Sequence, residues 1–188
     1  MKKVIITGAD GYVASRIIPH LETKFELTLV DLDFNHSHNS KTIKFDICNS
    51  PISELNKITK NHDAIIHLAY VRPEKTRDPY NTEEELKSFD TEYQNILMAN
   101  KIYQSAYINS LSRVIVASSN HAADWYEHNE IHNNIRDMVS NSQIPYSDNF
   151  YGWAKASYEL LSVPYASGKF GRKLEFVHVR IGFPREIT

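Results

Sequence analysis

The sequence has one cysteine, few glycines and no long apolar run, and these absences exclude several classes of protein. Cys48 has no second cysteine in the chain to pair with, so an internal disulfide framework is excluded. No apolar stretch approaches the ~20 residues needed to cross a bilayer, and the N-terminus lacks the apolar core and the small-residue cleavage site of a signal peptide. We therefore expect a cytoplasmic protein that does not span a membrane.

An excess of charge of either sign is also absent. The 21 Lys and Arg residues and the 23 Asp and Glu residues give a formal net charge of −2, without a basic or acidic run. The charge therefore gives no reason to expect a nucleic-acid partner. With 41% hydrophobic and 23% charged residues, the 188-residue chain has the composition of a folded globular protein and the length of one domain.

Short apolar segments rich in β-branched residues alternate with segments long enough for helices. This alternation predicts an α/β fold, a doubly wound parallel sheet (Rossmann fold) with helices on both faces. Strands are expected at residues 3–7, 26–31, 42–45, 64–68, 113–117 and 174–180. Helices are expected at residues 12–23 and 89–110, and a third, capped by Asp148, carries residues 151–170 with an interruption near Pro164. Residues 122–147 are polar and irregular, which indicates a long surface loop with room for one short helix.

The first expected strand leads into the sequence TGADGYVA at residues 7–14, which opens a helical pattern. Gly8 permits a tight turn, Gly11 lets the backbone approach a pyrophosphate, and Ala14 lets the helix pack on the strand. Asp31 ends the second strand, near the ~20-residue spacing at which a carboxylate meets the adenosine ribose hydroxyls. Its charge would repel a 2′-phosphate, so NAD is favoured over NADP. The alternative is an ordinary β-to-α turn beside a solvated acidic residue.

Tyr151 and Lys155 are four residues apart and so share one face of a helix. An ammonium and an oxidised nicotinamide ring both favour the ionised phenol, which can remove a proton from an alcohol while hydride leaves for the cofactor. Ser118 and Ser119 end the fifth strand, at the sheet edge that faces the ligand crevice. Ser119 is the better candidate for orienting the reacting oxygen, and capping of the next segment is its structural alternative.

These residues, together with Phe45-Asp46-Ile47 and His67-Leu68-Ala69, resemble the extended short-chain dehydrogenase/reductases, the NAD-dependent epimerase/dehydratase family. The resemblance covers nearly the whole chain and implies Ser119, Tyr151 and Lys155 as the catalytic set. It implies that Asn95 supports the helix beside the active site. Asp46 is expected at the cofactor by the same resemblance, although from the residues alone it could simply cap a turn. The expected cofactor-binding residues are Gly8, Gly11, Tyr12, Val13, Asp31, Asp46, Ile47, Leu68, Ala69, Asn95 and Lys155.

Within that family, the strings ASSNH at residues 117–121 and VRIG at residues 179–182 resemble the uronate dehydrogenases. This resemblance implies a sugar substrate held by Ser118, Asn120, His121 and Arg180, with the Arg180 guanidinium on a carboxylate. Arg180 could equally form a salt bridge at a strand end, and His121 could be a loop histidine without a partner. Where the uronate enzymes have a small hydroxyl residue after His-Leu, this chain has Val71-Arg72-Pro73, and Arg72 would alter the size and charge of the pocket.

The first functional hypothesis is NAD-dependent oxidation of a uronic acid, or a related sugar acid, to its lactone. The alternatives are a sugar-nucleotide epimerase or dehydratase with bound NAD, and a catalytically inactive nucleotide-binding module. Residues 1–188 would form the NAD-binding domain, and the C-terminal substrate-binding lobe of the family is expected to be absent. The family resemblance suggests a homodimer that pairs through the two long helices around Phe89 and Tyr151. No metal site is expected, although His128 and His132 are four residues apart, and His36 and His38 are expected to be solvated.

Overall fold

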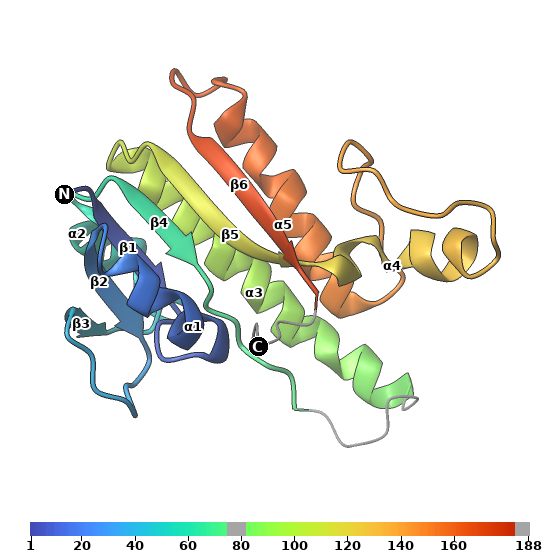
Figure 1. Ribbon diagram of the computed structural model, residues 1–188, viewed down its shortest axis with the longest axis horizontal. Coiled ribbons are helices and arrows are strands. Elements are labelled where there is room, and N and C mark those ends of the chain that lie inside the picture. Colours follow the sequence, from blue (N-terminus) through green and yellow to red (C-terminus); the bar gives the residue numbers. More distant parts are fainter. Residues whose placement is uncertain (75–81, 183–188) are drawn as a thin grey trace.

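The structure is a computed structural model, and it describes residues 1–74 and 82–182. Six parallel strands form one sheet in the order β3-β2-β1-β4-β5-β6 (Figure 1). Their bounds are β1 Lys3–Thr7, β2 Glu26–Asp31, β3 Lys41–Lys44, β4 Ala64–His67, β5 Arg113–Ser119 and β6 Glu175–Ile181. The Rossmann fold expected from the sequence is confirmed, and the six strands lie within a few residues of their predicted positions.

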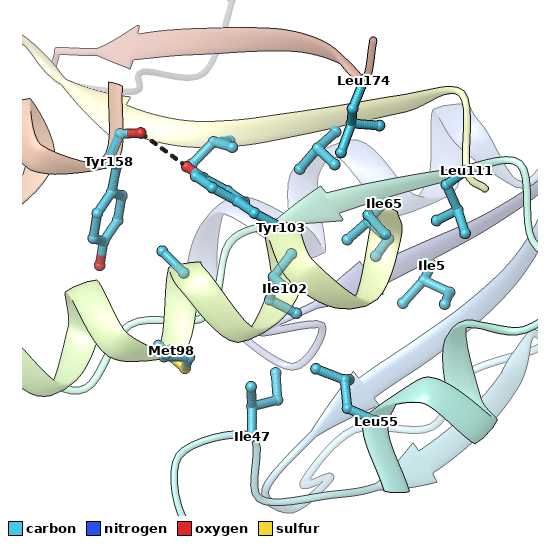
Figure 2. Close-up of a cluster of buried hydrophobic side chains, with 14 of the residues drawn as sticks. Ile5, Ile47, Leu55, Ile65, Met98, Ile102, Tyr103, Leu111, Tyr158 and Leu174 are labelled. Atoms are coloured by element: carbon cyan, nitrogen blue, oxygen red, sulfur yellow. Dashed lines mark hydrogen bonds between the residues drawn. The ribbon is translucent and has the colours of Figure 1, made fainter. Parts of the chain in front are cut away.

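The central strands carry apolar side chains on both faces, and helices cover the two faces of the sheet to different extents. On one face, helices α2 (Ile52–Thr59), α3 (Thr82–Ile108) and α5 (Phe150–Ala166) cover a core that includes Ile5, Ile65 and Leu111 (Figure 2). The Tyr103 hydroxyl of α3 donates to the Tyr158 carbonyl oxygen of α5 at 3.1 Å, which ties these two long helices together.

On the opposite face, α1 (Tyr12–Leu21) packs on Val4, Ile6 and Leu29. The expected cover on both faces is therefore present over β1 and β2. It does not extend to β6, where Val177 and Val179 are 44% and 45% exposed.

Helix boundaries were harder to predict than strands. The sequence reading did not identify α2, and α3 begins seven residues before the expected start. The cap of α5 is Asn149, not Asp148, because Asn149 accepts the Gly152 N–H at 2.8 Å while Asp148 pairs with His128. The expected interruption at Pro164 is wrong, since the helix continues to Ala166.

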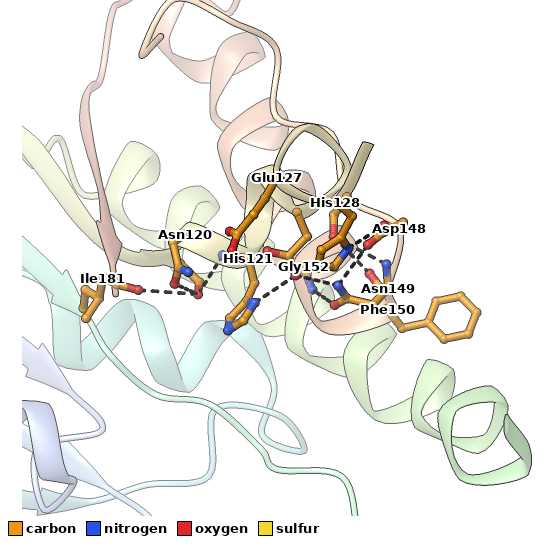
Figure 3. Close-up of polar contacts among 12 residues, drawn as sticks. Asn120, His121, Glu127, His128, Asp148, Asn149, Phe150, Gly152 and Ile181 are labelled. Atoms are coloured by element: carbon orange, nitrogen blue, oxygen red, sulfur yellow. Dashed lines mark hydrogen bonds and ion pairs between the residues drawn. The ribbon is translucent and has the colours of Figure 1, made fainter. Parts of the chain in front are cut away.

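The expected loop after β5 begins with three short helical turns, η1 (Asn120–Ala123), α4 (Asp124–Tyr126) and η2 (Glu127–Ile131). They place polar side chains beside the start of α5 (Figure 3). Within residues 1–74 and 82–182, no helix is both long and apolar enough to span a membrane.

Candidate functional site

A cavity of about 680 Å³ opens at the carboxyl ends of the strands. It lies where the strand order reverses between β1 and β4, the position at which open α/β sheets bind ligands. Of the predicted residues, its wall includes Gly8, Gly11, Tyr12, Val13, Asp31, Asp46, Ile47, Leu68, Ala69, Ser118, Ser119, His121, Tyr151 and Lys155. Asn95, Asn120 and Arg180 do not line it.

One end of the cavity is built from backbone. Gly8 has φ +69°, and a Cβ there would lie 2.6 Å from the Ala69 nitrogen, so no larger residue fits this turn. No side chain caps α1 at Gly11, which leaves the N–H groups of its first turn open toward the cavity. An uncapped helix N-terminus behind a tight glycine turn suits a phosphate group. These residues therefore fit the pyrophosphate of a dinucleotide.

Asp31 holds its carboxylate at the end of β2, on the cavity wall. It accepts the backbone N–H of Asp10 at 2.8 Å and that of Leu32 at 2.7 Å. These bonds fix the carboxylate beside the glycine turn and leave acceptor capacity for ribose hydroxyls.

The neighbouring Asp10 carboxylate organises the loop that follows β2. It accepts hydrogen bonds from the Asn35 backbone N–H at 2.8 Å, and it pairs with the imidazoles of His36 and His38 at 2.9 and 3.1 Å. These bonds together lower the pKa of Asp10 against the opposing effect of burial. The prediction of a solvated His38 is wrong, because its side chain is only 11% exposed.

The segments after β3 and β4 form a further part of the cavity wall. Asp46 and Ile47 line it on one side, and Leu68 and Ala69 on the other. Asp46 also accepts the backbone N–H of Asn49 at 3.0 Å and its side-chain amide at 2.8 Å. Asp46 therefore both caps a turn and faces the cavity, and the bonds from Asn49 lower its pKa.

Asn95 of α3 is fully buried, and both ends of its amide bind the backbone of Val71 at 2.8 Å. The sequence-based expectation placed Asn95 among the cofactor-binding residues. Its position is instead behind the wall, where it fixes the segment that follows β4.

At the other end of the cavity, α5 presents Tyr151 and Lys155 one turn apart, opposite Ser119 of β5. The Lys155 ammonium is buried and donates to the Ala117 carbonyl oxygen at 3.1 Å. It lies 4.6–5.8 Å from the ring centres of Tyr70, Tyr151 and Tyr158. A fixed cation is thus held beside the phenol of Tyr151.

Burial lowers the pKa of Lys155 to about 8, with the nearby Glu92 carboxylate acting in the opposite direction. Below about pH 8 the folded protein retains the buried ammonium, and this burial lowers the free energy of unfolding. Between about pH 8 and 10.5 the folded state has lost this proton while the unfolded state retains it, so stability rises with pH. Relative to Lys155→Met, the wild-type free energy of unfolding should increase over this range by up to about 3 kcal/mol. Denaturant unfolding of both proteins without nucleotide tests this, and a pH-independent difference would contradict it.

Ser119 combines the two roles considered for it. Its hydroxyl caps η1 by accepting the His121 backbone N–H at 3.2 Å. Its own proton has only long contacts, at 3.3 Å to Asn120 and 3.5 Å to the Ile181 carbonyl oxygen. Such contacts are weak, so the proton can be redirected to a substrate oxygen at little cost.

Asp124 was missed by the sequence analysis. Its buried carboxylate accepts from the His121 Nδ1 at 2.8 Å and from the Asn149 amide at 2.7 Å. His121 is therefore not a histidine without a partner, and its other ring nitrogen is left for a further contact. Because Asn149 caps α5, the same carboxylate couples the cavity wall to the start of the helix that carries Tyr151.

Arg180 has the alternative role, a salt bridge at a strand end. Its guanidinium binds the Glu159 carboxylate bidentately, at 2.9 and 2.8 Å, and the Ser118 hydroxyl donates to the same carboxylate at 2.7 Å. Neither partner of this pair lines the cavity. The sequence alone does not indicate this pairing, because Glu159 is one of several polar residues in the segment that forms α5.

His128 and His132 each lie beside a carboxylate. Among the residues that the structure describes, no group of three or more His, Cys, Asp or Glu side chains is arranged to hold a metal ion. The ring of His128 bonds to Asp148 at 2.8 Å, and that of His132 lies 3.7 Å from Glu127.

A curated relative, the uncharacterized protein YtbQ of Bacillus subtilis (strain 168), is 28% identical over 182 residues, covering 97% of this chain and 68% of the relative. A structure described as a mutated uronate dehydrogenase has a TM-score of 0.74 and 27% identity, over 96% of this chain and 58% of that chain. Glucuronic acid dehydrogenase from Chromohalobacter salexigens also has a TM-score of 0.74, with 25% identity, over 97% of this chain and 61% of that chain. The chain thus spans about three fifths of these two solved structures.

A family model matches residues 4–181, which include the glycine turn, Asp31 and the Tyr151–Lys155 pair. The glycine turn at one end of the cavity and the Tyr151–Lys155 pair at the other both agree with this match. The chain belongs to the NAD dependent epimerase/dehydratase family.

Proposed function

We propose that the protein is an NAD-dependent oxidoreductase that acts on a sugar, and that it oxidises a uronic acid or a related sugar acid to its lactone. One observation carries this proposal: a single cavity has a phosphate cradle at Gly8 and Gly11 and a Ser119–Tyr151–Lys155 group at its other end. The similarity to uronate and glucuronic acid dehydrogenases supports the choice of substrate. Residues 1–188 would serve as the nucleotide-binding unit.

NAD, which the Gly8–Gly11 turn and Asp31 would hold, would supply the hydride acceptor for the carbon that carries the reacting hydroxyl. Tyr151 would take the hydroxyl proton on its phenol oxygen. The Lys155 ammonium, held by the Ala117 carbonyl oxygen, would stabilise the negative charge of the ionised phenol. Ser119 would donate its weakly engaged proton to the reacting oxygen and so orient it.

A sugar-nucleotide epimerase or dehydratase would use the same groups but return the hydride to the substrate, so that NAD is not consumed. To separate the two activities, the protein is incubated with NAD and glucuronate or galacturonate while NADH absorbance is followed. A parallel incubation with UDP-sugars is analysed by chromatography. We expect NADH and a lactone from the sugar acid. An altered UDP-sugar without NADH would contradict the oxidation, and nucleotide binding without turnover of either class would indicate an inactive module.

We also propose that two copies pair through α3 and α5. Phe89, Tyr93 and Leu97 recur every four residues along α3 and are 39–47% exposed, and Phe89 stacks on Trp153 of α5 at 5.6 Å. A dimer would cover this apolar stripe. Light scattering after size exclusion should give a dimer for the wild type and a monomer for Tyr93→Lys/Leu97→Lys. Ile144→Lys, which changes an exposed apolar residue elsewhere, should remain dimeric. A monomeric wild type would contradict this pairing.

A further inference from the structure

The cavity presents a different arginine from the one that the sequence suggested. Arg180 is already neutralised, because Glu159 takes both of its hydrogen-bonding edges and Ser118 secures the carboxylate from a second side. A substrate carboxylate would have to displace Glu159 from Arg180 and leave its half-buried charge without a cation, which is unfavourable. Arg180 is therefore poorly placed to bind an acidic substrate.

Arg72 lines the cavity, and its side chain is exposed to solvent. It has no ion pair or hydrogen bond to any part of the chain that the structure describes. Lys155 is the other lysine or arginine on the described wall, and its ammonium is buried against the Ala117 carbonyl oxygen. Arg72 thus supplies the one solvent-accessible guanidinium on the described cavity wall.

The backbone that carries Arg72 is fixed beside the candidate catalytic group. Tyr70 packs edge-on against Tyr151, with ring centres 5.5 Å apart, and its hydroxyl donates to the buried Glu92. Val71 is held at both its N–H and its carbonyl by Asn95. Burial raises the pKa of Tyr70, and the positive charge of Arg72 acts in the opposite direction.

The site proposed for the pyrophosphate is the glycine turn, which lies at the start of this segment. Ala69 adjoins the Gly8 turn, where a Cβ would lie 2.6 Å from the Ala69 nitrogen. From Ala69 the chain passes to Tyr70, which contacts Tyr151, and only then to Arg72. Arg72 therefore lines the same cavity two residues after the side chain that contacts Tyr151, and this order indicates the Tyr151 side of the cavity, where a substrate is proposed to lie.

We infer that Arg72 binds the anionic group of the sugar substrate, a carboxylate or a phosphate, through charge-assisted hydrogen bonds. The inference rests on the proposed function in that it takes the substrate to be a sugar bound next to Tyr151. It assigns the selection of an acidic over a neutral sugar to this residue. Arg180 then serves to hold Glu159 and the end of β6 in place.

The test measures binding, so it does not require turnover. Saturation-transfer NMR titrations of the NADH-bound protein and of the protein alone are run with glucuronate, glucose 6-phosphate and glucose. We expect the wild type to bind at least one of the two anionic sugars about 10- to 100-fold more tightly than glucose, as one charged hydrogen-bonding pair provides. Arg72→Gln should remove this preference, and Arg72→Lys should retain part of it. Arg113→Gln, which alters an exposed arginine at the opposite end of β5, should bind as the wild type does.

Preference for glucuronate alone identifies a carboxylate site, and preference for glucose 6-phosphate alone identifies a phosphate site. A wild type without preference for either anion, or an Arg72→Gln variant that keeps it, would overturn the inference. The proposed function fails separately: anion-selective binding that Arg72→Gln abolishes, without NADH formation, would refute the oxidation and leave the role of Arg72 intact. NADH formation from glucuronate with a KM that is unchanged in Arg72→Gln would support the oxidation and refute the role of Arg72.

Discussion

Replacing Tyr151 by phenylalanine is expected to lower kcat by about 10²- to 10⁴-fold, the usual contribution of a positioned proton acceptor. The ring remains, so its contacts with Tyr70 and His121, both at 5.5 Å, are retained. Lys155 keeps its bond to the Ala117 carbonyl oxygen. Nucleotide affinity and the free energy of unfolding should therefore stay close to those of the wild type, and the loss should fall on the chemical step.

The measurement is the rate of NADH formation at saturating sugar acid, together with calorimetric titration of the nucleotide. Tyr146→Phe is the matched control, because it removes a phenol hydroxyl from an exposed tyrosine outside the cavity. It should leave kcat unchanged. A Tyr151→Phe variant with wild-type kcat would show that this phenol does not accept the proton.

Replacing Gly152 by alanine is expected to lower the free energy of unfolding by about 2–4 kcal/mol, through overpacking at a site without room to relax. A Cβ at this position would lie 2.1 Å from both the His121 carbonyl oxygen and the Ser147 Oγ. Either η1 or the first turn of α5 must move. Both elements carry wall residues, His121 and Tyr151, so catalysis should fall together with stability.

Gly182→Ala is the control for this effect, because a Cβ there would meet nothing within 4 Å. Denaturant unfolding of the two variants gives the comparison directly. We expect the unfolding midpoint of Gly182→Ala to match that of the wild type. If Gly152→Ala were equally stable, the close packing of η1 on α5 would be refuted.

The fold was predictable because its signals are local. Each strand appears as a short run of β-branched residues, and the glycine turn, Asp31 and the Tyr151–Lys155 spacing can each be found within a few residues of sequence. Helix ends were less predictable. Asp148 and Asn149 are both good capping residues, and the choice between them depends on a pairing of Asp148 with His128, 20 residues away.

The parts of the site that could not be predicted depend on contacts between distant residues. The pairing of Arg180 with Glu159 joins β6 to α5, and Asp124 is recognisable only once its burial under His121 and Asn149 is known. Asn95 was expected near the cofactor, but its role depends on the path of the backbone at Val71. In each case the side chain is a common polar residue whose partner is set by the fold.

Calorimetric titration with NAD and NADH tests the central claim most directly, namely that the cavity at the carboxyl edge of the sheet holds a nicotinamide dinucleotide. We predict saturable binding of at least one of the two at a stoichiometry of one per chain, and its loss in Gly8→Val, whose side chain would fill the turn against Ala69. The absence of any heat from wild-type protein with either nucleotide, or full binding by Gly8→Val, would contradict the account.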